Sequence, residues 1–424
     1  MTDVARGTDN PARAASARVR RVLERALEGK LLDWTEALEL CRVHGADLHA
    51  LVATADLLRS RQAGEGVSYV VNRNVNFTNV CSKACKFCAF SRTHRSEQAY
   101  FLDTGEIVRR VVEAHELGAT EVCLQAGLPR GVPGSIYVDL CRAIKEAVPN
   151  IHIHAFSPEE VRFGAELSGC SVERYIEELI AAGLGSMPGT SAEILDDSVR
   201  ERLAGGRIGT NDWIRVIRAA HERGLRTTST VMFGHVETDR QLVGHLDTLR
   251  AIQLETHGFT EFVPLSFVHT ESPLYLKRLL PDVRPGPTGS EVVRLFAIAR
   301  LFLGASFVNI QASWVKEGPR QAQWLLSCGA NDLGGTLINE SISTAAGASH
   351  GERMQPRELR RLIREAGRIP VERDTLYRVR KEHPLEAPAD DVDGPLDTVD
   401  PRDARFGSYL SLTRDSRFRY KRLD

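Results

Sequence analysis

The sequence has no excess of charge of either sign: 55 Lys and Arg residues stand against 56 Asp and Glu residues, for a formal net charge of -1. Proteins that bind nucleic acid usually carry a strong basic excess, so this balance argues against a nucleic-acid partner. No apolar run approaches the roughly 20 residues that cross a bilayer, and Met1 to Ala12 lacks the apolar core of a secretion signal. We therefore expect a cytoplasmic protein that binds neither membranes nor nucleic acid.

A glycine-rich dinucleotide-binding fingerprint is also missing, which disfavours an open nucleotide-binding sheet. Instead, strand and helix patterns alternate along the chain, as in parallel strands joined by crossover helices. The strand candidates are 68–72 continuing toward 76–78, then 121–125, 151–156, 185–187, 227–233, 259–263, 307–311 and 331–333. The helix candidates are 105–117, 136–147, 172–182, 212–223, 239–253, 291–303 and 356–366. This α/β pattern predicts a TIM-like (β/α) barrel, in which chemistry gathers at the C-terminal ends of the strands.

The 424 residues divide into three parts. Residues 1–66 form an N-terminal helical extension, because 12–61 is amphipathic and Asp33 or Thr35 could cap one of its helices. Residues 67–377 form the barrel core. Residues 378–424 are polar and rich in Asp, Arg and Pro, so we expect a flexible or surface-wrapping C-terminal tail.

Three of the eight cysteines fall within eight residues, spaced CxxxCxxC at Cys81, Cys85 and Cys88. Soft thiolate ligands suit iron–sulfur centres. No fourth cysteine follows nearby, and an incomplete ligand set leaves one iron open to a substrate. The alternative is a structural zinc site, which needs a closed set of four ligands. His94 could complete such a set, at an untypical spacing.

The residues between these cysteines add to the motif. Lys83 and Lys86 would favour the thiolate form of the neighbouring thiols. With Phe87 directly before the last cysteine, the loop resembles the signature of radical S-adenosylmethionine (SAM) enzymes. The resemblance implies a radical SAM type of barrel with a 4Fe–4S cluster, whose open iron is chelated by SAM, and a 5′-deoxyadenosyl radical. It also implies that Phe87 lies against the adenine, although an apolar residue there could simply pack in the core.

Longer stretches between residues 68 and 377 resemble one family of this superfamily, the tyrosine-using subunit of deazaflavin (FO) synthase, or 5-amino-6-(D-ribitylamino)uracil–L-tyrosine 4-hydroxyphenyl transferase. The matching stretches are 74–81, 88–92, 155–160, 185–190, 259–267, 309–311 and 329–337. The resemblance implies that tyrosine loses a hydrogen at its amine, that its Cα–Cβ bond breaks, and that the 4-hydroxybenzyl fragment joins carbon five of the ribitylaminouracil. A one-electron reductant is implied. So is a second radical SAM subunit, since this chain carries only one cysteine triplet and is too short for two barrels.

Two other functions stay open at this point. Aminofutalosine synthase, a radical SAM enzyme of menaquinone biosynthesis, shares much of the sequence pattern. From another class, the chain could be a non-catalytic iron–sulfur scaffold or an electron carrier, which would not need an open iron.

Four polar or small residues near strand ends are candidates for binding SAM. Gln125 and Gly127 follow the 121–125 strand, where related enzymes place a glycine-containing loop against the SAM amino group; a plain turn is the alternative. Glu193 could bind the ribose hydroxyls, or could be a carboxylate at a helix N-terminus. Glu237 follows a glycine turn that suits the adenine, and it could bind a hydroxyl.

The catalytic candidates lie on other strands. His152 and His154 share one face at period two, so His154 could act as acid or base, or could be a satisfied core residue. Gln311 and Asn331 stand at the predicted ends of later strands, where amides suit a ribityl chain and a pyrimidine. Trp314 could stack on a flat ring, but burial in the core is the commoner role.

Overall fold

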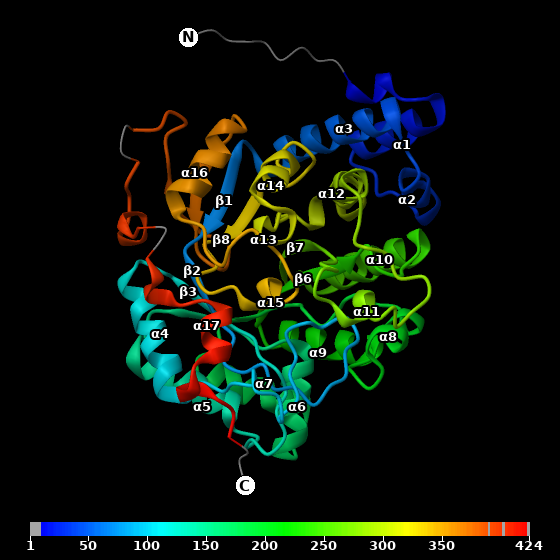
Figure 1. Ribbon diagram of the computed structural model, residues 1–424. Coiled ribbons are helices and arrows are strands. Elements are labelled where there is room, and N and C mark those ends of the chain that lie inside the picture. Colours follow the sequence, from blue (N-terminus) through cyan, green and yellow to red (C-terminus); the bar gives the residue numbers. More distant parts are fainter. Residues whose placement is uncertain (1–9, 389–390, 401–402, 422–424) are drawn as a thin grey trace.

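The N-terminal part of the chain is helical, as predicted for 12–61. The computed structural model describes residues 10–388, 391–400 and 403–421, so most of the segment from Met1 to Ala12 lies outside the described residues. The helices are α1 (Ala17–Leu27), α2 (Trp34–Leu40) and α3 (Gly45–Ala63). Of the two expected caps, Asp33 fills the role: its side chain accepts a hydrogen bond from the backbone N–H of Glu36 at 2.9 Å. Helix α3 packs against α12, which places the extension on the outside of the barrel (Figure 1).

Parallel strands form the centre of the molecule. Six of them make one sheet in the order β2-β3-β4-β5-β6-β7, and β1 and β8 are neighbours in a second sheet. The strands are β1 (Gly66–Val70), β2 (Asn72–Val75), β3 (Glu121–Leu124), β4 (His152–Ala155), β5 (Ser186–Met187), β6 (Arg226–Phe233), β7 (Phe259–Ser266) and β8 (Asp332–Gly335). Each predicted strand except 307–311 corresponds to one of them.

The two sheets join into a closed ring. β1 and β2 follow each other with only Val71 between them, and β1 pairs in parallel with β8. On the other side, Ile310 forms a parallel bridge with Phe262 of β7, and Gln311 forms one with Asp332 of β8. Pairing therefore runs through eight strand positions and returns to its start. This confirms the predicted TIM-like barrel, although the seventh position is reduced to these two bridges.

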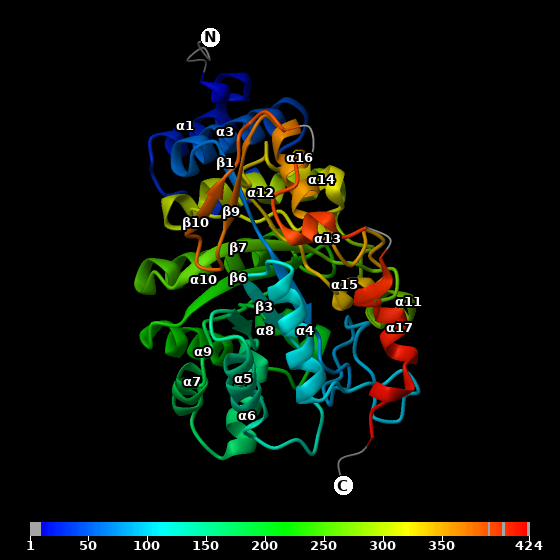
Figure 2. The ribbon, with the colours of Figure 1, turned by 90° about the vertical axis from the view of Figure 1, so that its left-hand side faces the viewer.

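Helices surround the ring, most of them on its outside and some at its C-terminal end (Figures 1 and 2). They are α4 (Thr104–Glu116), α5 (Ile136–Ala147), α6 (Pro158–Ser168), α7 (Val172–Ala181), α8 (Asp197–Ala204), α9 (Thr210–Glu222), α10 (Asp239–Thr256), α11 (Pro273–Leu276), α12 (Gly289–Leu303), α13 (Trp314–Glu317), α14 (Pro319–Leu325), α15 (Ser341–Ala345) and α16 (Pro356–Glu365). The predicted helices are all present. Helix α6 was not predicted, although Ser157 and Glu160 form a capping box at its start.

The C-terminal tail wraps over the surface of the barrel. The tail was expected to begin at residue 378, but a hairpin already starts within the expected core: β9 (Ile369–Arg373) pairs in parallel with β1, and β10 (Val379–Glu382) pairs with β9. The tail then continues along the surface. It ends near α17 (Tyr409–Arg414), which contacts α15, and Figure 2 shows this end far from the N-terminal helices. Backbone hydrogen bonds from Phe101 to Phe418 and from Tyr420 to Ala99 attach the last described residues. Among the described residues, no helix is long and apolar enough to cross a membrane.

Candidate active site

One cavity of about 380 Å³ lies at the C-terminal ends of the barrel strands. Segments that follow or end all eight strand positions contribute to its wall. They are 81–91, 125–128, 157–160, 190–193, 230–232, 265–268, 313–316 and 337–346. Catalytic sites of such barrels gather at this face because the loops that follow the strands converge there. The cavity is therefore the candidate active site.

The cysteine loop forms one wall of the cavity, and all three of its thiols line it. Neighbouring loops hold its backbone: Cys81 N–H donates to Arg92 O at 3.1 Å, and Ser82 N–H donates to Leu128 O at 2.8 Å. Burial raises the pKa of the Cys85 thiol to about 12 and also raises that of Cys88. Without a metal, these two sulfurs are protonated at neutral pH.

The flanking lysines, which were expected to favour the thiolates, are bound by groups outside the cysteine loop. The Lys83 ammonium lies 3.2 Å from the Glu159 carboxylate and donates to Gly206 O, and that of Lys86 donates to Arg202 O at 2.7 Å. Both charges are thus bound by groups of α6, α8 and the residues directly after α8. A nearby cation that favours the thiolates is the half-buried Arg207, whose effect is smaller than that of burial of the thiols.

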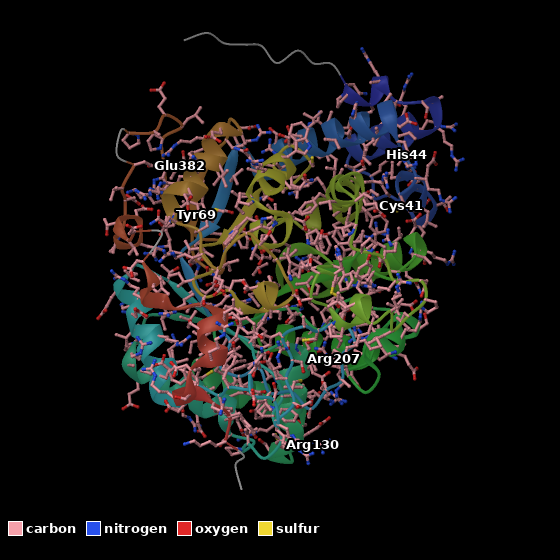
Figure 3. The ribbon with its side chains drawn as sticks, in the orientation of Figure 1. Cys41, His44, Tyr69, Arg130, Arg207 and Glu382 are labelled. Atoms are coloured by element: carbon pink, nitrogen blue, oxygen red, sulfur yellow. The ribbon has the colours of Figure 1, made fainter. Side chains whose placement is uncertain are left out.

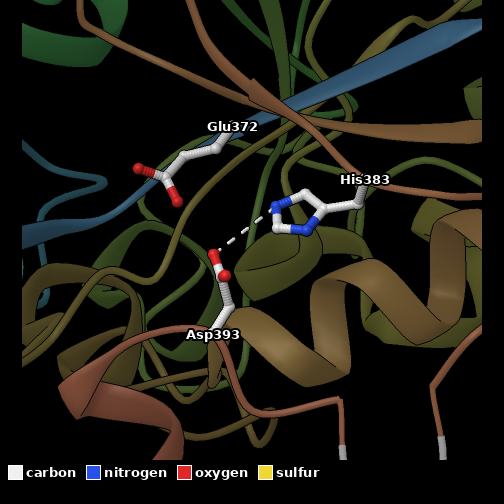
Figure 4. Close-up of side chains that lie close together, drawn as sticks. All are labelled: Glu372, His383 and Asp393. Atoms are coloured by element: carbon white, nitrogen blue, oxygen red, sulfur yellow. Dashed lines mark ion pairs between the residues drawn. The ribbon is translucent and has the colours of Figure 1, made fainter.

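The donor geometry does not favour a single zinc ion. His94 is exposed on a loop and lies outside the cavity wall. Among the described residues, the only three metal-ligating groups that gather within 4.8 Å are Glu372, His383 and Asp393 (Figure 4). The three sulfurs are therefore more widely spaced than the ligands of one zinc ion, whose Zn–S bonds are about 2.3 Å long.

The Glu372, His383 and Asp393 group is held by the protein's own cations and is far from the cysteine loop in the sequence. Lys381 bonds to the Asp393 carboxylate, and Arg380 lies 3.3 Å from that of Glu372. The His383 ring lies 3.9 Å from Asp393 (Figure 4). These contacts explain why the Glu372, His383 and Asp393 side chains lie together: they attach the tail to the barrel.

The structure brings four of the five residues predicted to bind SAM, namely Phe87, Gln125, Gly127 and Glu193, to the cavity. The Gln125 amide donates to Thr190 Oγ1 at 3.0 Å. Glu193 does not lie at a helix N-terminus, because α8 begins only at Asp197. Its carboxylate instead lies 2.9 Å from the guanidinium of Arg207, whose position Figure 3 shows.

The fifth residue, Glu237, is outside this cavity, and its expected SAM contact is not supported. Its carboxylate accepts hydrogen bonds from the backbone N–H groups of Gly234 and His235 and lies 3.0 Å from the Arg284 guanidinium. It thereby stabilises the turn after β6 and lines a separate cavity near α10 and α12.

None of the three predicted catalytic residues lines the active-site cavity. His154 is buried within β4, and both its Nδ1 and the Nε2 of His152 lie 2.7 Å from Ser186 Oγ, so the shared face was predicted correctly. Burial lowers the pKa of His154 to about 4. The Gln311 side chain lies against Gly334 of β8. Both belong to the barrel interior.

Asn331 was predicted at a strand end but directly precedes β8, at its N-terminal end. Its Oδ1 accepts hydrogen bonds from the guanidinium of Arg300 and from the backbone N–H of Ile310, both at 2.9 Å. Burial lowers the pKa of Arg300 to about 9. Asn331 therefore provides a hydrogen-bond acceptor for the buried Arg300 guanidinium, at the opposite end of the barrel from the cavity. Its predicted position at the C-terminal end of a strand is wrong.

Several charged residues of the cavity were not predicted to act there. They are Glu160, Arg207 and Glu340; Lys316, which was expected among the polar groups at the end of the seventh strand, also lines the cavity. Glu160 accepts hydrogen bonds from the N–H of Ser157 at 2.7 Å and from that of Ala126 at 3.0 Å, while burial raises its pKa to about 7. The Ser-x-x-Glu spacing of the capping box could have revealed Glu160. No local pattern marks Arg207, which follows two glycines.

Comparisons with known proteins agree with this site. The radical SAM superfamily profile matches residues 75–249, and the CofH/MqnC C-terminal region matches 256–386. The chain is 47% identical to 5-amino-6-(D-ribitylamino)uracil–L-tyrosine 4-hydroxyphenyl transferase of Methanothermobacter thermautotrophicus, over 85% of this chain and 97% of the relative. The corresponding enzyme of Methanocaldococcus jannaschii is 48% identical over 81% and 96%. An FO synthase of Mycobacterium tuberculosis is 48% identical over 81% of this chain but only 40% of the relative.

Solved structures support the fold at low sequence identity. Methylornithine synthase has a TM-score of 0.65 with 16% identity, covering 82% of this chain and 97% of that one. The [FeFe]-hydrogenase maturase HydG has a TM-score of 0.63 with 17% identity, covering 85% and 77%.

Proposed function

Because this chain belongs to the radical SAM superfamily, and within it to the family of the 5-amino-6-(D-ribitylamino)uracil–L-tyrosine 4-hydroxyphenyl transferases, we propose that it catalyses their reaction. It cleaves the Cα–Cβ bond of tyrosine and joins the 4-hydroxybenzyl group to carbon five of the ribitylaminouracil. The products are 5-amino-5-(4-hydroxybenzyl)-6-(D-ribitylimino)-5,6-dihydrouracil, iminoacetate, methionine and 5′-deoxyadenosine. The observation that carries this proposal is near-complete coverage of a relative of that name at 47% identity.

The residues present fit a 4Fe–4S cluster and SAM. Three thiols on one cavity wall are a donor set for three irons of a cubane. When bound, the cluster and SAM supply the 5′-deoxyadenosyl radical. Cys81, Cys85 and Cys88 would hold the cluster.

Residues around the loop would bind SAM. Gly127 leaves room beside the loop, because a Cβ there would meet Val80 O at 2.2 Å. Gln125 and Phe87 flank the same space, and Glu193 with Arg207 offers an acceptor and a donor beside it. These side chains would orient SAM against the wall that carries the cysteines.

The chain needs two further partners for the complete pathway. A one-electron reductant would start each turnover. A second radical SAM activity would close the ring of the product; the chain spans 40% of an FO synthase that it resembles.

The test is anaerobic incubation of the reconstituted protein with SAM, dithionite, tyrosine and the ribitylaminouracil, followed by mass spectrometry. We expect the coupled product with free 5′-deoxyadenosine, dependent on both co-substrates, and little product when phenylalanine replaces tyrosine. An adenosyl adduct of an enolpyruvyl benzoate would indicate an aminofutalosine synthase instead. An electron carrier would show no SAM-dependent change in the EPR spectrum of the cluster.

A further inference from the structure

The charged residues around the cavity fall into two groups. On the cysteine side, each cation has a carboxylate partner: Lys83 lies 3.2 Å from Glu159, and Arg207 lies 2.9 Å from Glu193. On the side formed by the segments that follow residue 311 and β8, the charged residues are Lys316 and Glu340. The second pair is not used by the cluster or by the SAM contacts proposed above.

Lys316 is a half-buried cation that lines the cavity without a protein partner among the described residues. It lies on α13, and the Trp314 indole on the same short helix donates to Gly335 O at 2.9 Å, which fixes the segment against β8. The Lys316 ammonium makes no hydrogen bond or ion pair with any residue that the structure describes. Burial lowers its pKa, and the nearby charge of Glu340 opposes this shift. A cation that lines a cavity without a protein partner is free to bind an anionic ligand there, and partial burial strengthens that attraction.

Glu340 is held in a fixed orientation at the same side of the cavity. Its Oε1 accepts a hydrogen bond from Ser343 N–H at 2.7 Å, and its Oε2 accepts one from the Asn74 amide at 2.5 Å. Asn74 belongs to β2, whose C-terminal end leads into the cysteine loop. Each carboxylate oxygen can accept a second hydrogen bond, so Glu340 can still bind a donor in the cavity.

We propose that Lys316 and Glu340 bind the two charged groups of the tyrosine substrate, Lys316 its carboxylate and Glu340 its amine; this inference rests on the proposed function. An α-amino acid carries both groups on one carbon, and two opposite charges facing one cavity complement it. Apolar side chains of the same wall, Leu337 and Ile342, leave room for the phenol ring.

The arrangement also orients the reaction. The Asn74 amide joins Glu340 to β2, which leads into the cysteine loop, so an amine bound by Glu340 lies on the side of the cavity next to that loop. That amine is the group from which hydrogen is taken. Lys316 and Glu340 are therefore positioning residues, with a role in substrate choice.

The experiment measures binding without turnover. Cluster-reconstituted enzyme is titrated calorimetrically, with SAM present and no reductant, against tyrosine, tyramine (which lacks the carboxylate) and 3-(4-hydroxyphenyl)propionate (which lacks the amine). The variants are Lys316→Met, Lys316→Arg and Glu340→Gln, with the exposed Lys277→Met as the matched control. Iron content and reductive SAM cleavage are measured for each.

In wild type, tyrosine should bind about 10- to 100-fold more tightly than either analogue, the range expected for one hydrogen bond to a charged group. Lys316→Met should bind tyrosine no more tightly than tyramine, because the variant can no longer contact the carboxylate that tyramine lacks. Glu340→Gln should bind tyrosine no more tightly than the propionate, because the variant has lost the charge that contacts the amine. Lys316→Arg should keep part of the preference. Lys277→Met should match wild type, and iron content and SAM cleavage should stay unchanged throughout.

Two outcomes would overturn the inference: an unchanged preference in Lys316→Met or Glu340→Gln, or a loss of iron or of SAM cleavage in either variant, which would indicate a role toward the cluster or SAM. If wild type binds tyrosine but forms no coupled product, the proposed reaction fails while the binding test stands. If wild type forms product and the preferences do not move, only the roles of Lys316 and Glu340 fail.

Discussion

Gly127→Ala should release the cysteine loop. Two backbone hydrogen bonds flank Cys81 on this side: Gly127 N–H donates to Thr78 O and Ser82 N–H donates to Leu128 O, each at 2.8 Å. Between them, a Cβ on Gly127 would lie 2.2 Å from Val80 O and 2.7 Å from its carbonyl carbon. Both atoms are backbone, so no side-chain rotation relieves the clash.

The size of the effect follows from these distances. An ordinary contact at this position is about 3.4 Å, so the loop must retreat by about 1 Å. Overpacking of this kind costs about 1–3 kcal/mol. Because the displaced residue directly precedes Cys81, we expect cluster content to fall along with the free energy of unfolding.

Two measurements check this expectation: iron per chain after anaerobic reconstitution, and urea unfolding of the protein without its cluster. The matched control is Gly289→Ala, since a Cβ at Gly289 meets nothing within 4 Å and that residue begins α12. If Gly127→Ala binds as much iron as Gly289→Ala and unfolds at the same urea concentration, the close approach is not what holds the loop.

Three further predictions concern the cluster, the buried histidine and the buried asparagine. Alanine at any one predicted cluster ligand should abolish both the brown colour of about four irons per chain and product formation, whereas Cys123→Ala should keep normal iron content; full activity in any ligand variant would contradict the assignment. These ligands are Cys81, Cys85 and Cys88. Burial lowers the pKa of His154 from 6.5 to about 4, so the unfolded chain takes up a proton that the folded chain refuses, and stability falls as the pH drops from about 6.5 toward 4. In urea unfolding at several pH values, His154→Gln should lose less stability over this window than wild type; identical slopes would show that another group is responsible. Asn331→Ala should lower the free energy of unfolding by about 1–3 kcal/mol, because it leaves the buried Arg300 short of an acceptor, and should bind normal iron; a selective loss of coupling with unchanged stability would restore its predicted catalytic role.

The sequence by itself determined the features that depend on residues close together in the chain. The CxxxCxxC spacing places three thiols in one loop, and apolar periods of two and 3.6 mark strands and helices. Their alternation was enough for the barrel, because parallel strands joined by helices have few ways to pack. It was also enough to place Gln125, Gly127 and Glu193 at the cavity, since each follows a strand.

Only the tertiary structure decided which other polar residues face the cavity. Asn331 lies one residue before β8, at the far end of the barrel, and Glu237 turns toward Arg284. Lys316 reaches the cavity because a short helix, with no periodicity to reveal it, follows residue 311. A shift of one residue along a strand reverses the face that a side chain occupies, and the partners that hold these groups come from distant segments. Local sequence patterns therefore do not show which side chains face the cavity. The closed barrel does, because it fixes which distant segments are neighbours.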